Sequence, residues 1–218
     1  MAKFSTILFD LDGTISDPKS GITKSVAYAL DYLKIPYPSL DSLCVFIGPP
    51  LRDSFSDYGV KENDIGLAIE KYREYYIREN GIFDLKIYAG FADMLKKLKQ
   101  ADKKIFLATC KTRIFAQDIL EHFSLAQYFD FVSGSELDGT RITKGEVIAY
   151  ALAETKTPAS SEVIMVGDRK HDIIGAKENN LQVASVLYGY GNREEFEAHH
   201  TDFIVETVKD LEQFLLRG

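Results

Sequence analysis

The chain has 218 residues, of which 45% are hydrophobic, enough for one large domain or for a core domain with a smaller companion. A formal net charge of −7, without a long lysine or arginine run, excludes the basic surface typical of nucleic-acid-binding proteins. Two cysteines, Cys44 and Cys110, exclude a disulfide framework and a thiolate zinc cluster, and no apolar run resembles a secretory signal or a membrane span, so we expect a cytoplasmic protein.

Strand-like and helix-like segments alternate along most of the chain. Continuous apolar runs predict strands at 4–9, 103–109, 129–134, 161–168, 181–187 and 202–206. Helical periodicity predicts helices at 90–100, 113–123, 144–154, 172–180 and 208–217. Apolar strands separated by amphipathic helices predict an α/β fold, a Rossmann-like three-layer core in which helices cover both faces of a mostly parallel sheet.

Residues 16–86 interrupt this alternation. The segments 21–34 and 62–80 have helical periodicity, and no convincing strand lies between them, although the apolar run 43–48 resembles one. Turn-forming residues stand on both sides of the interruption. We therefore expect an α/β core made of residues 1–15 and 87–218, with a helical cap inserted at 16–86.

Polar residues follow the predicted strands at the edge where open α/β sheets bind ligands. They are Asp10 and Asp12 after the first strand, Thr109 to Lys111 after the second, Lys144 at the start of the helix after the third, and Asp168 and Asp172 after the fourth. Clustered carboxylates repel one another unless a cation lies among them, and oxygen ligands without histidine or cysteine suit magnesium. Lys144 and Thr109 can then hold phosphoryl oxygens, and Gly13 lets backbone amides near Asp12 point at them.

Asp10 and Asp12 together suit a covalent phosphoryl transfer. Two carboxylates at i and i+2 on a turn can face one site. One can attack phosphorus and form an aspartyl-phosphate, and the other, Asp12, can protonate the leaving oxygen and later take a proton from water. Magnesium and Lys144 would stabilise the charge on the transferring phosphoryl group.

Four motifs, in this order, resemble those of the haloacid dehalogenase superfamily of phosphotransferases. They are FDLDGT (9–14), LATCK (107–111), Lys144 within RITKGEVI, and VIMVGDRKHD (163–172). The resemblance covers nearly the whole chain, and the helical insert is similar to the small cap of its phosphoglycolate phosphatase and 5′-nucleotidase-like branch. In one departure, the third motif often reads Lys-Pro, whereas Lys144 here precedes Gly145.

This resemblance implies roles for individual residues. Asp10 would be the nucleophile and Asp12 the acid and base, while Asp10, Asp168 and the backbone carbonyl of Asp12 would bind magnesium. Asp172 would hold metal-bound water or Lys144. The residues implied at the phosphate or the substrate are Gly13, Thr109, Cys110, Lys111, Lys144 and, from a cap loop, Arg52. Cys110 has an alternative reading as a small packing residue, and Lys111 and Arg52 as solvated charges.

The expected function is that of a magnesium-dependent phosphatase for a small phosphate monoester, with the cap closing over the substrate. Phosphoglycolate, nucleoside monophosphates, sugar phosphates and pyrophosphate all fit. A phosphomutase would share the aspartyl-phosphate, a dehalogenase would need neither the metal nor Asp12, and a phospho-accepting signalling receiver would be shorter and lack the insert. We expect no nucleic acid polymer or membrane as a partner, and either a monomer or a homodimer.

Overall fold

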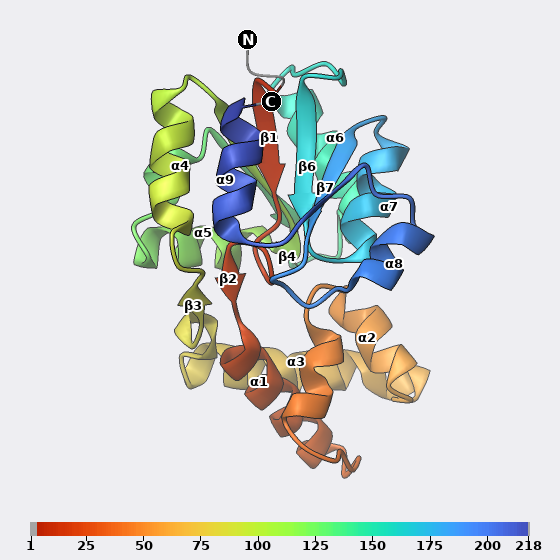
Figure 1. Ribbon diagram of the computed structural model, residues 1–218. Helices are drawn as coiled ribbons and strands as arrows, with labels where there is room; N and C mark the ends of the chain where they lie inside the picture. The colour runs from red at the N-terminus through yellow and green to blue at the C-terminus, as the bar shows by residue number, and fades with distance from the viewer. Residues whose placement is uncertain (1–3, 218) are drawn as a thin grey trace. The chain divides into compact units, whose positions relative to one another are not determined.

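The computed structural model describes residues 4–217, and its α/β part contains a six-stranded parallel sheet (Figure 1). The strands are β1 (Thr6–Phe9), β4 (Lys104–Thr112), β5 (Phe131–Ser135), β6 (Val163–Gly167), β7 (Gln182–Val186) and β8 (Phe203–Val205). Their order is β5-β4-β1-β6-β7-β8, and every adjacent pair is parallel. All four residues of β1 are buried, which suits a central strand paired on both edges. The predicted fold class is confirmed.

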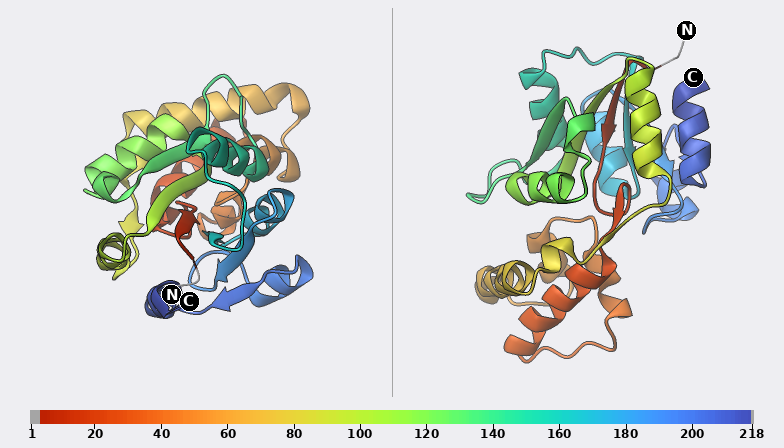
Figure 2. Two further views of the ribbon diagram at one scale, coloured as in Figure 1. Left: turned by 90° about the horizontal axis from the view of Figure 1, so that it is seen from above. Right: turned by 90° about the vertical axis from the view of Figure 1, so that its left-hand side faces the viewer.

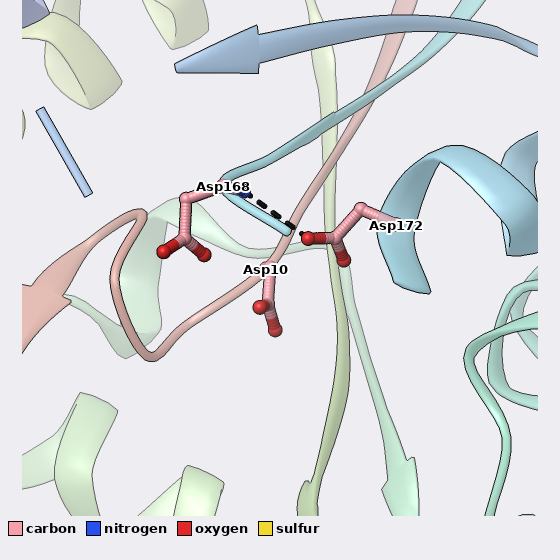
Figure 3. A group of neighbouring side chains, drawn as sticks. All are labelled: Asp10, Asp168 and Asp172. Atoms are coloured by element: carbon pink, nitrogen blue, oxygen red, sulfur yellow. Dashed lines mark hydrogen bonds between the residues drawn. The ribbon is translucent and has the colours of Figure 1, made fainter. Parts of the chain in front are cut away.

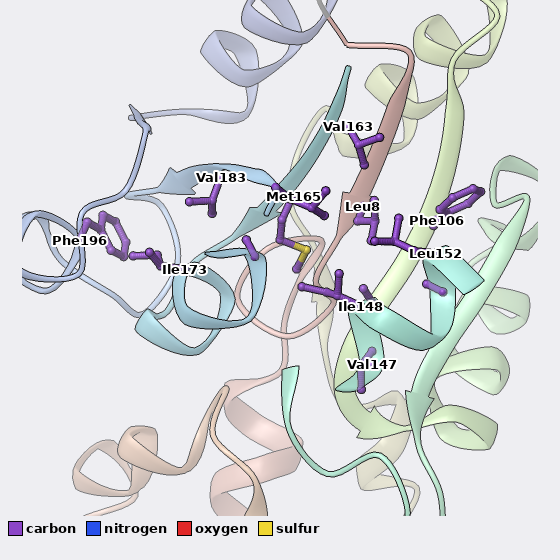
Figure 4. Close-up of a cluster of buried hydrophobic side chains, with 14 residues drawn as sticks. Leu8, Phe106, Val147, Ile148, Leu152, Val163, Met165, Ile173, Val183 and Phe196 are labelled. Atoms are coloured by element: carbon purple, nitrogen blue, oxygen red, sulfur yellow. The ribbon is translucent and has the colours of Figure 1, made fainter. Parts of the chain in front are cut away.

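Helices cover both faces of this sheet. They are α4 (Phe91–Gln100), α5 (Arg113–His122), α6 (Lys144–Glu154), α7 (Lys170–Glu178), α8 (Arg193–Ala198) and α9 (Val208–Arg217), with a short 3₁₀ helix, η3, at Ala126–Tyr128. Leu8 and Met165 belong to a buried cluster with residues of α6 and α7 (Figure 4). Because side chains alternate along a strand, Phe9 points to the opposite face, where its ring lies 5.4 Å from that of Phe91 in α4. Helices α4 and α9 lie on the same side of the strands (Figure 2).

The chain divides into two compact units, one formed by the residues up to Asp17 together with those from Ile87 onward, and the other by Pro18–Lys86. The second unit contains α1 (Lys19–Tyr32), η1 (Asp41–Phe46), α2 (Leu51–Asp57), α3 (Glu62–Arg78) and η2 (Gly81–Phe83). Two short strands, β2 (Ser16–Asp17) and β3 (Lys86–Ile87), pair where the chain leaves the first unit and returns to it.

Close packing shapes the helical unit. Helix α1 packs against α3 and against η2. A Cβ atom at Gly21 would lie 2.0 Å from the carbonyl oxygen of Gly81, so only glycine permits this approach. The apolar run 43–48 lies largely in the 3₁₀ helix η1 and forms no strand. Nowhere in residues 4–217 is a helix both long and apolar enough to cross a membrane.

Candidate active site

Three buried carboxylates meet at the carboxyl edge of the sheet. The amide of Asp10 donates to the carbonyl oxygen of Val166 at 2.9 Å, which sets the end of β1 beside the end of β6. Asp168 follows β6 directly, and Asp172 lies in the first turn of α7. One carboxylate oxygen from each of Asp10, Asp168 and Asp172 lies within 4.8 Å of the other two (Figure 3). The first and fourth sequence motifs therefore meet as predicted.

Lys144 reaches this cluster from the first residue of α6. Its Nζ lies 2.7 Å from Oδ1 of Asp10 and 2.8 Å from Oδ1 of Asp172, and it donates to the carbonyl oxygen of Ala108 at 2.9 Å. These three acceptors match the three donors of an ammonium group. Burial alone would lower the pKa of Lys144, but the two carboxylates outweigh it and raise this pKa. Lys144 is therefore held in its charged form.

The Lys144-Gly145 sequence does not disturb the start of α6. Thr143 caps the helix by accepting from the amide of Glu146, and the Glu146 carboxylate accepts from the amide of Thr143. Helix α7 packs closely here, since a Cβ atom at Gly175 would lie 2.8 Å from the backbone nitrogen of Gly145. The capping box and this close contact together fix the position from which Lys144 extends.

Replacing Lys144 by methionine should lower the free energy of unfolding by about 3–5 kcal/mol, because it leaves buried carboxylates without their cation. The measurement is urea unfolding in EDTA. Lys97→Met is the matched control, since Lys97 is half exposed and its ion pair with Glu212 should contribute about 0–1 kcal/mol. If both variants lost the same free energy of unfolding, the result would contradict the proposed importance of the buried ion pairs of Lys144.

Asp172 connects Lys144 to the turn that carries Asp168. Its Oδ2 accepts from the amides of Asp168 and Arg169, each at 3.1 Å. Burial raises the pKa of Asp172 to about 6, with Lys144 lowering it and Asp10 raising it further. Asp172 thus occupies the place beside Lys144 that the family resemblance implied for it.

Asp168 is completely buried and closely surrounded by backbone. Its Oδ2 accepts from the amide of Tyr190 at 2.7 Å, and its Oδ1 accepts from the hydroxyl of Thr14 at 3.4 Å. Gly13 has a φ of +84°, and a Cβ atom there would lie 2.1 Å from Oδ2 of Asp168. The amide of Gly13 donates to the carbonyl oxygen of Ser16 at 2.7 Å, and the expected contact of Gly13 with a phosphate stays a prediction. Glycine is needed here for the turn and for the approach of Asp168.

Asp12 forms an ion pair with Lys111, whose Nζ lies 2.5 Å from Oδ2 of Asp12. Burial raises the pKa of Asp12, and Lys111 opposes that effect. The amide of Lys111 donates to the hydroxyl oxygen of Thr109 at 3.2 Å. The pairing of β4 with β5 is irregular between Ala108 and Thr112, an arrangement that often turns side chains toward a site.

The charges at this edge do not balance. Three buried carboxylates, those of Asp10, Asp168 and Asp172, lie together with one lysine, Lys144, so that in their ionised forms two negative charges are left in excess, while Asp12 pairs separately with Lys111. Burial raises the pKa of Asp168 well above its usual range, and Asp172 and Asp10 raise it further. A divalent cation would remove both the excess charge and this repulsion, and a set of oxygen ligands suits magnesium.

Two of the predicted substrate residues, Cys110 and Arg52, make contacts with other parts of the protein. Cys110 is half-buried, and its carbonyl oxygen accepts from the hydroxyl of Ser135 at 2.9 Å. Arg52 lies on α2 in the helical unit and pairs with Glu62. The expected contacts of Cys110 and Arg52 with the substrate stay predictions.

Known proteins resemble this chain over most of its length. The sequence profile of the haloacid dehalogenase-like hydrolases matches residues 7–186. The chain belongs to the haloacid dehalogenase-like hydrolase family. A 5′-nucleotidase of Pseudomonas aeruginosa is 38% identical over 214 residues, which span 98% of this chain and 96% of that protein. The tyrosine-protein kinase PtkA of Mycobacterium tuberculosis is 33% identical over 215 residues, 96% of this chain and 72% of that protein.

Solved structures agree with this assignment. The crystal structure of a predicted phosphatase from Clostridium acetobutylicum superimposes with a TM-score of 0.95, at 42% identity over 99% of both chains. The family and the enzyme class expected from the sequence, a phosphoric monoester hydrolase, are thereby confirmed.

Proposed function

We propose that this hydrolase is a magnesium-dependent phosphatase that transfers the phosphoryl group of a small monoester to Asp10 and then to water. The observation that carries the proposal is the cluster of three buried carboxylates, Asp10, Asp168 and Asp172, beside one buried lysine, Lys144, which leaves two negative charges in excess when all three are ionised. Asp10 and Asp168 would hold the metal, together with the backbone carbonyl of Asp12. Bound magnesium would offset the charge of the substrate phosphoryl group and help to orient it.

The first step breaks the ester bond. A carboxylate oxygen of Asp10 attacks phosphorus while the bond from phosphorus to the leaving oxygen breaks, and Asp12 gives its proton to that oxygen. Burial, which raises the pKa of Asp12, favours the protonated form that this step needs. Lys144, 2.7 Å from Oδ1 of Asp10, fixes the orientation of the attacking carboxylate.

The second step returns the enzyme to its starting state. Asp12, now ionised, takes a proton from a water molecule whose oxygen attacks the phosphorus on Asp10. The bond from Asp10 to phosphorus breaks, inorganic phosphate leaves, and Asp12 is protonated again. Lys111, 2.5 Å from Asp12, stabilises the carboxylate in the interval between the two steps.

Nucleoside 5′-monophosphates are the proposed substrate class. The support is the 5′-nucleotidase of Pseudomonas aeruginosa, which matches this chain over nearly its whole length. Other small esters considered from the sequence, such as phosphoglycolate and sugar phosphates, share the reacting phosphate group and differ only in the part that leaves. The ranking of esters therefore tests the substrate class separately from the reaction.

The test is release of inorganic phosphate from AMP, phosphoglycolate, a sugar phosphate and pyrophosphate, each in magnesium and in EDTA. We expect release in magnesium from at least one ester, fastest from AMP, and a loss of this release in EDTA. If no ester releases phosphate in magnesium, the phosphatase proposal is wrong. Isomerisation of a sugar phosphate that depends on a bisphosphate activator would instead identify a phosphomutase.

A further inference from the structure

The loop after β7, residues 187–191, lies directly against Asp168. A Cβ atom at Gly189 would be 2.4 Å from Cβ of Asp168, and one at Gly191 would be 2.1 Å from the carbonyl oxygen of Asp168. No other residue type fits at either position without a shift of the backbone. The two glycines therefore allow the loop to enclose both the main chain and the side chain of this carboxylate.

Tyr190, between those glycines, touches both Asp168 and the segment that follows Asp10. Its amide donates to Oδ2 of Asp168 at 2.7 Å, while its hydroxyl donates to Oδ1 of Asp17 in β2. The same residue therefore joins Asp168 to the segment 10–17. All of these residues belong to the α/β unit.

A second tyrosine strengthens the link between the loop and this segment. The hydroxyl of Tyr188 donates to the carbonyl oxygen of Thr14 at 3.1 Å, and the hydroxyl of Thr14 donates to Oδ1 of Asp168. The rings of Tyr188 and Tyr88 pack edge to face, with centroids 5.0 Å apart. The loop is thus attached to the segment 14–17 at two points, on either side of Gly189.

We propose that Tyr190 is a positioning residue, whose hydroxyl holds the loop so that its amide keeps Asp168 oriented for magnesium. This inference rests on the proposed function, since it assumes that Asp168 binds the metal. A loop with two glycines has many alternative conformations, and the contact with Asp17 excludes most of them. Because Asp17 follows Asp10 in the same segment, the contact also fixes the position of Asp168 relative to Asp10, which is another proposed metal ligand.

The test is calorimetric titration of magnesium into metal-free protein, without substrate. Tyr190→Phe keeps the amide and the ring but loses the hydroxyl, and it should weaken magnesium binding about tenfold, at the lower end of what residues behind metal ligands contribute. Asp17→Ala, which removes the acceptor of the Tyr190 hydroxyl, should weaken it in the same direction. The double variant should bind no worse than Tyr190→Phe, because both changes break one contact.

Tyr150→Phe is the matched control, because Tyr150 lies in α6 and makes its contacts with Phe131 and Arg141 through its ring. It should bind magnesium as the wild type does. In turnover, Tyr190→Phe should raise the magnesium concentration needed for half-maximal activity, with kcat at saturating magnesium changed by no more than about threefold.

The outcomes separate this inference from the proposed function. If the wild type binds magnesium and both Tyr190→Phe and Asp17→Ala bind it within about twofold of the wild type, the role of Tyr190 is wrong and the phosphatase proposal stands. If the wild type releases phosphate in magnesium-free buffer and binds no magnesium, both are wrong. Weaker binding in both variants with an unchanged unfolding midpoint of the metal-free protein supports the inference.

Discussion

Asp10→Asn should lower phosphate release by about 10⁴-fold or more, since it removes the proposed nucleophile. The substitution keeps the size of the side chain, and its amide oxygen can still accept from Lys144. Lys144 also retains Asp172 at 2.8 Å and the carbonyl oxygen of Ala108 at 2.9 Å, so the variant should fold. The measurement is kcat for AMP in magnesium, accompanied by circular dichroism of the variant.

Asp118→Asn serves as the control for this change, because Asp118 is an exposed carboxylate on α5. It should leave kcat within about twofold of the wild type. Activity of Asp10→Asn comparable with that of the control would show that Asp10 does not attack phosphorus. The role assigned to it from both sequence and geometry would then be lost.

Asp12→Asn should lower kcat by about 10²–10⁴-fold on AMP, whose leaving oxygen needs a proton. The loss should be much smaller for the first step with an aryl phosphate, because a good leaving group departs without protonation. The variant removes the carboxylate that lies 2.5 Å from Lys111 and whose pKa burial raises. The measurement is the pre-steady-state release of the aryl alcohol compared with the steady-state rate.

An initial burst of aryl alcohol followed by slow turnover is the expected result, because loss of the base slows attack by water on the phosphoryl group. Lys111→Met is the matched comparison, since it keeps the carboxyl of Asp12 and removes only its partner. If Asp12→Asn lowered kcat on AMP and the burst rate on the aryl phosphate by the same factor, the result would argue against proton donation by Asp12.

The sequence predicts the strands of the core well because each is a continuous apolar run. β6 and β7 lie within the predicted ranges 161–168 and 181–187. β4 continues to Thr112, three residues beyond its predicted end at 109, where the sequence becomes polar near the site. The apolar pattern therefore predicts only the buried part of each strand, and the functional residues lie at the polar positions just beyond it.

Short elements escape such patterns for a physical reason. Helices α2 and α8 have seven and six residues, too few for a helical period to repeat, and β2 and β3 have two residues each. Helix α7 begins at Lys170, two residues before the predicted start, because its first residues, 170–172, are polar and show no apolar period. Such short or polar segments show no apolar periodicity from which a helix or strand could be predicted.

The residues of the site also differ in how far the sequence predicts them. The charged residues of the four motifs could be predicted because their side chains carry the chemistry. Tyr190 escaped notice because it holds Asp168 through a backbone amide, which any residue except proline offers. The two glycines that flank it, at 189 and 191, are the one signal that the sequence offers for this residue.

Covalent capture of the phosphoryl group tests the central claim most directly. Asp12→Asn is mixed with an aryl phosphate in magnesium, quenched in acid during the burst, digested, and examined by mass spectrometry. We predict one phosphoryl group on the peptide that contains Asp10, absent when Asp10→Asn is added to the same chain. Aryl alcohol released in a burst with no phosphoryl group on Asp10, or with that group on another residue, would contradict the account.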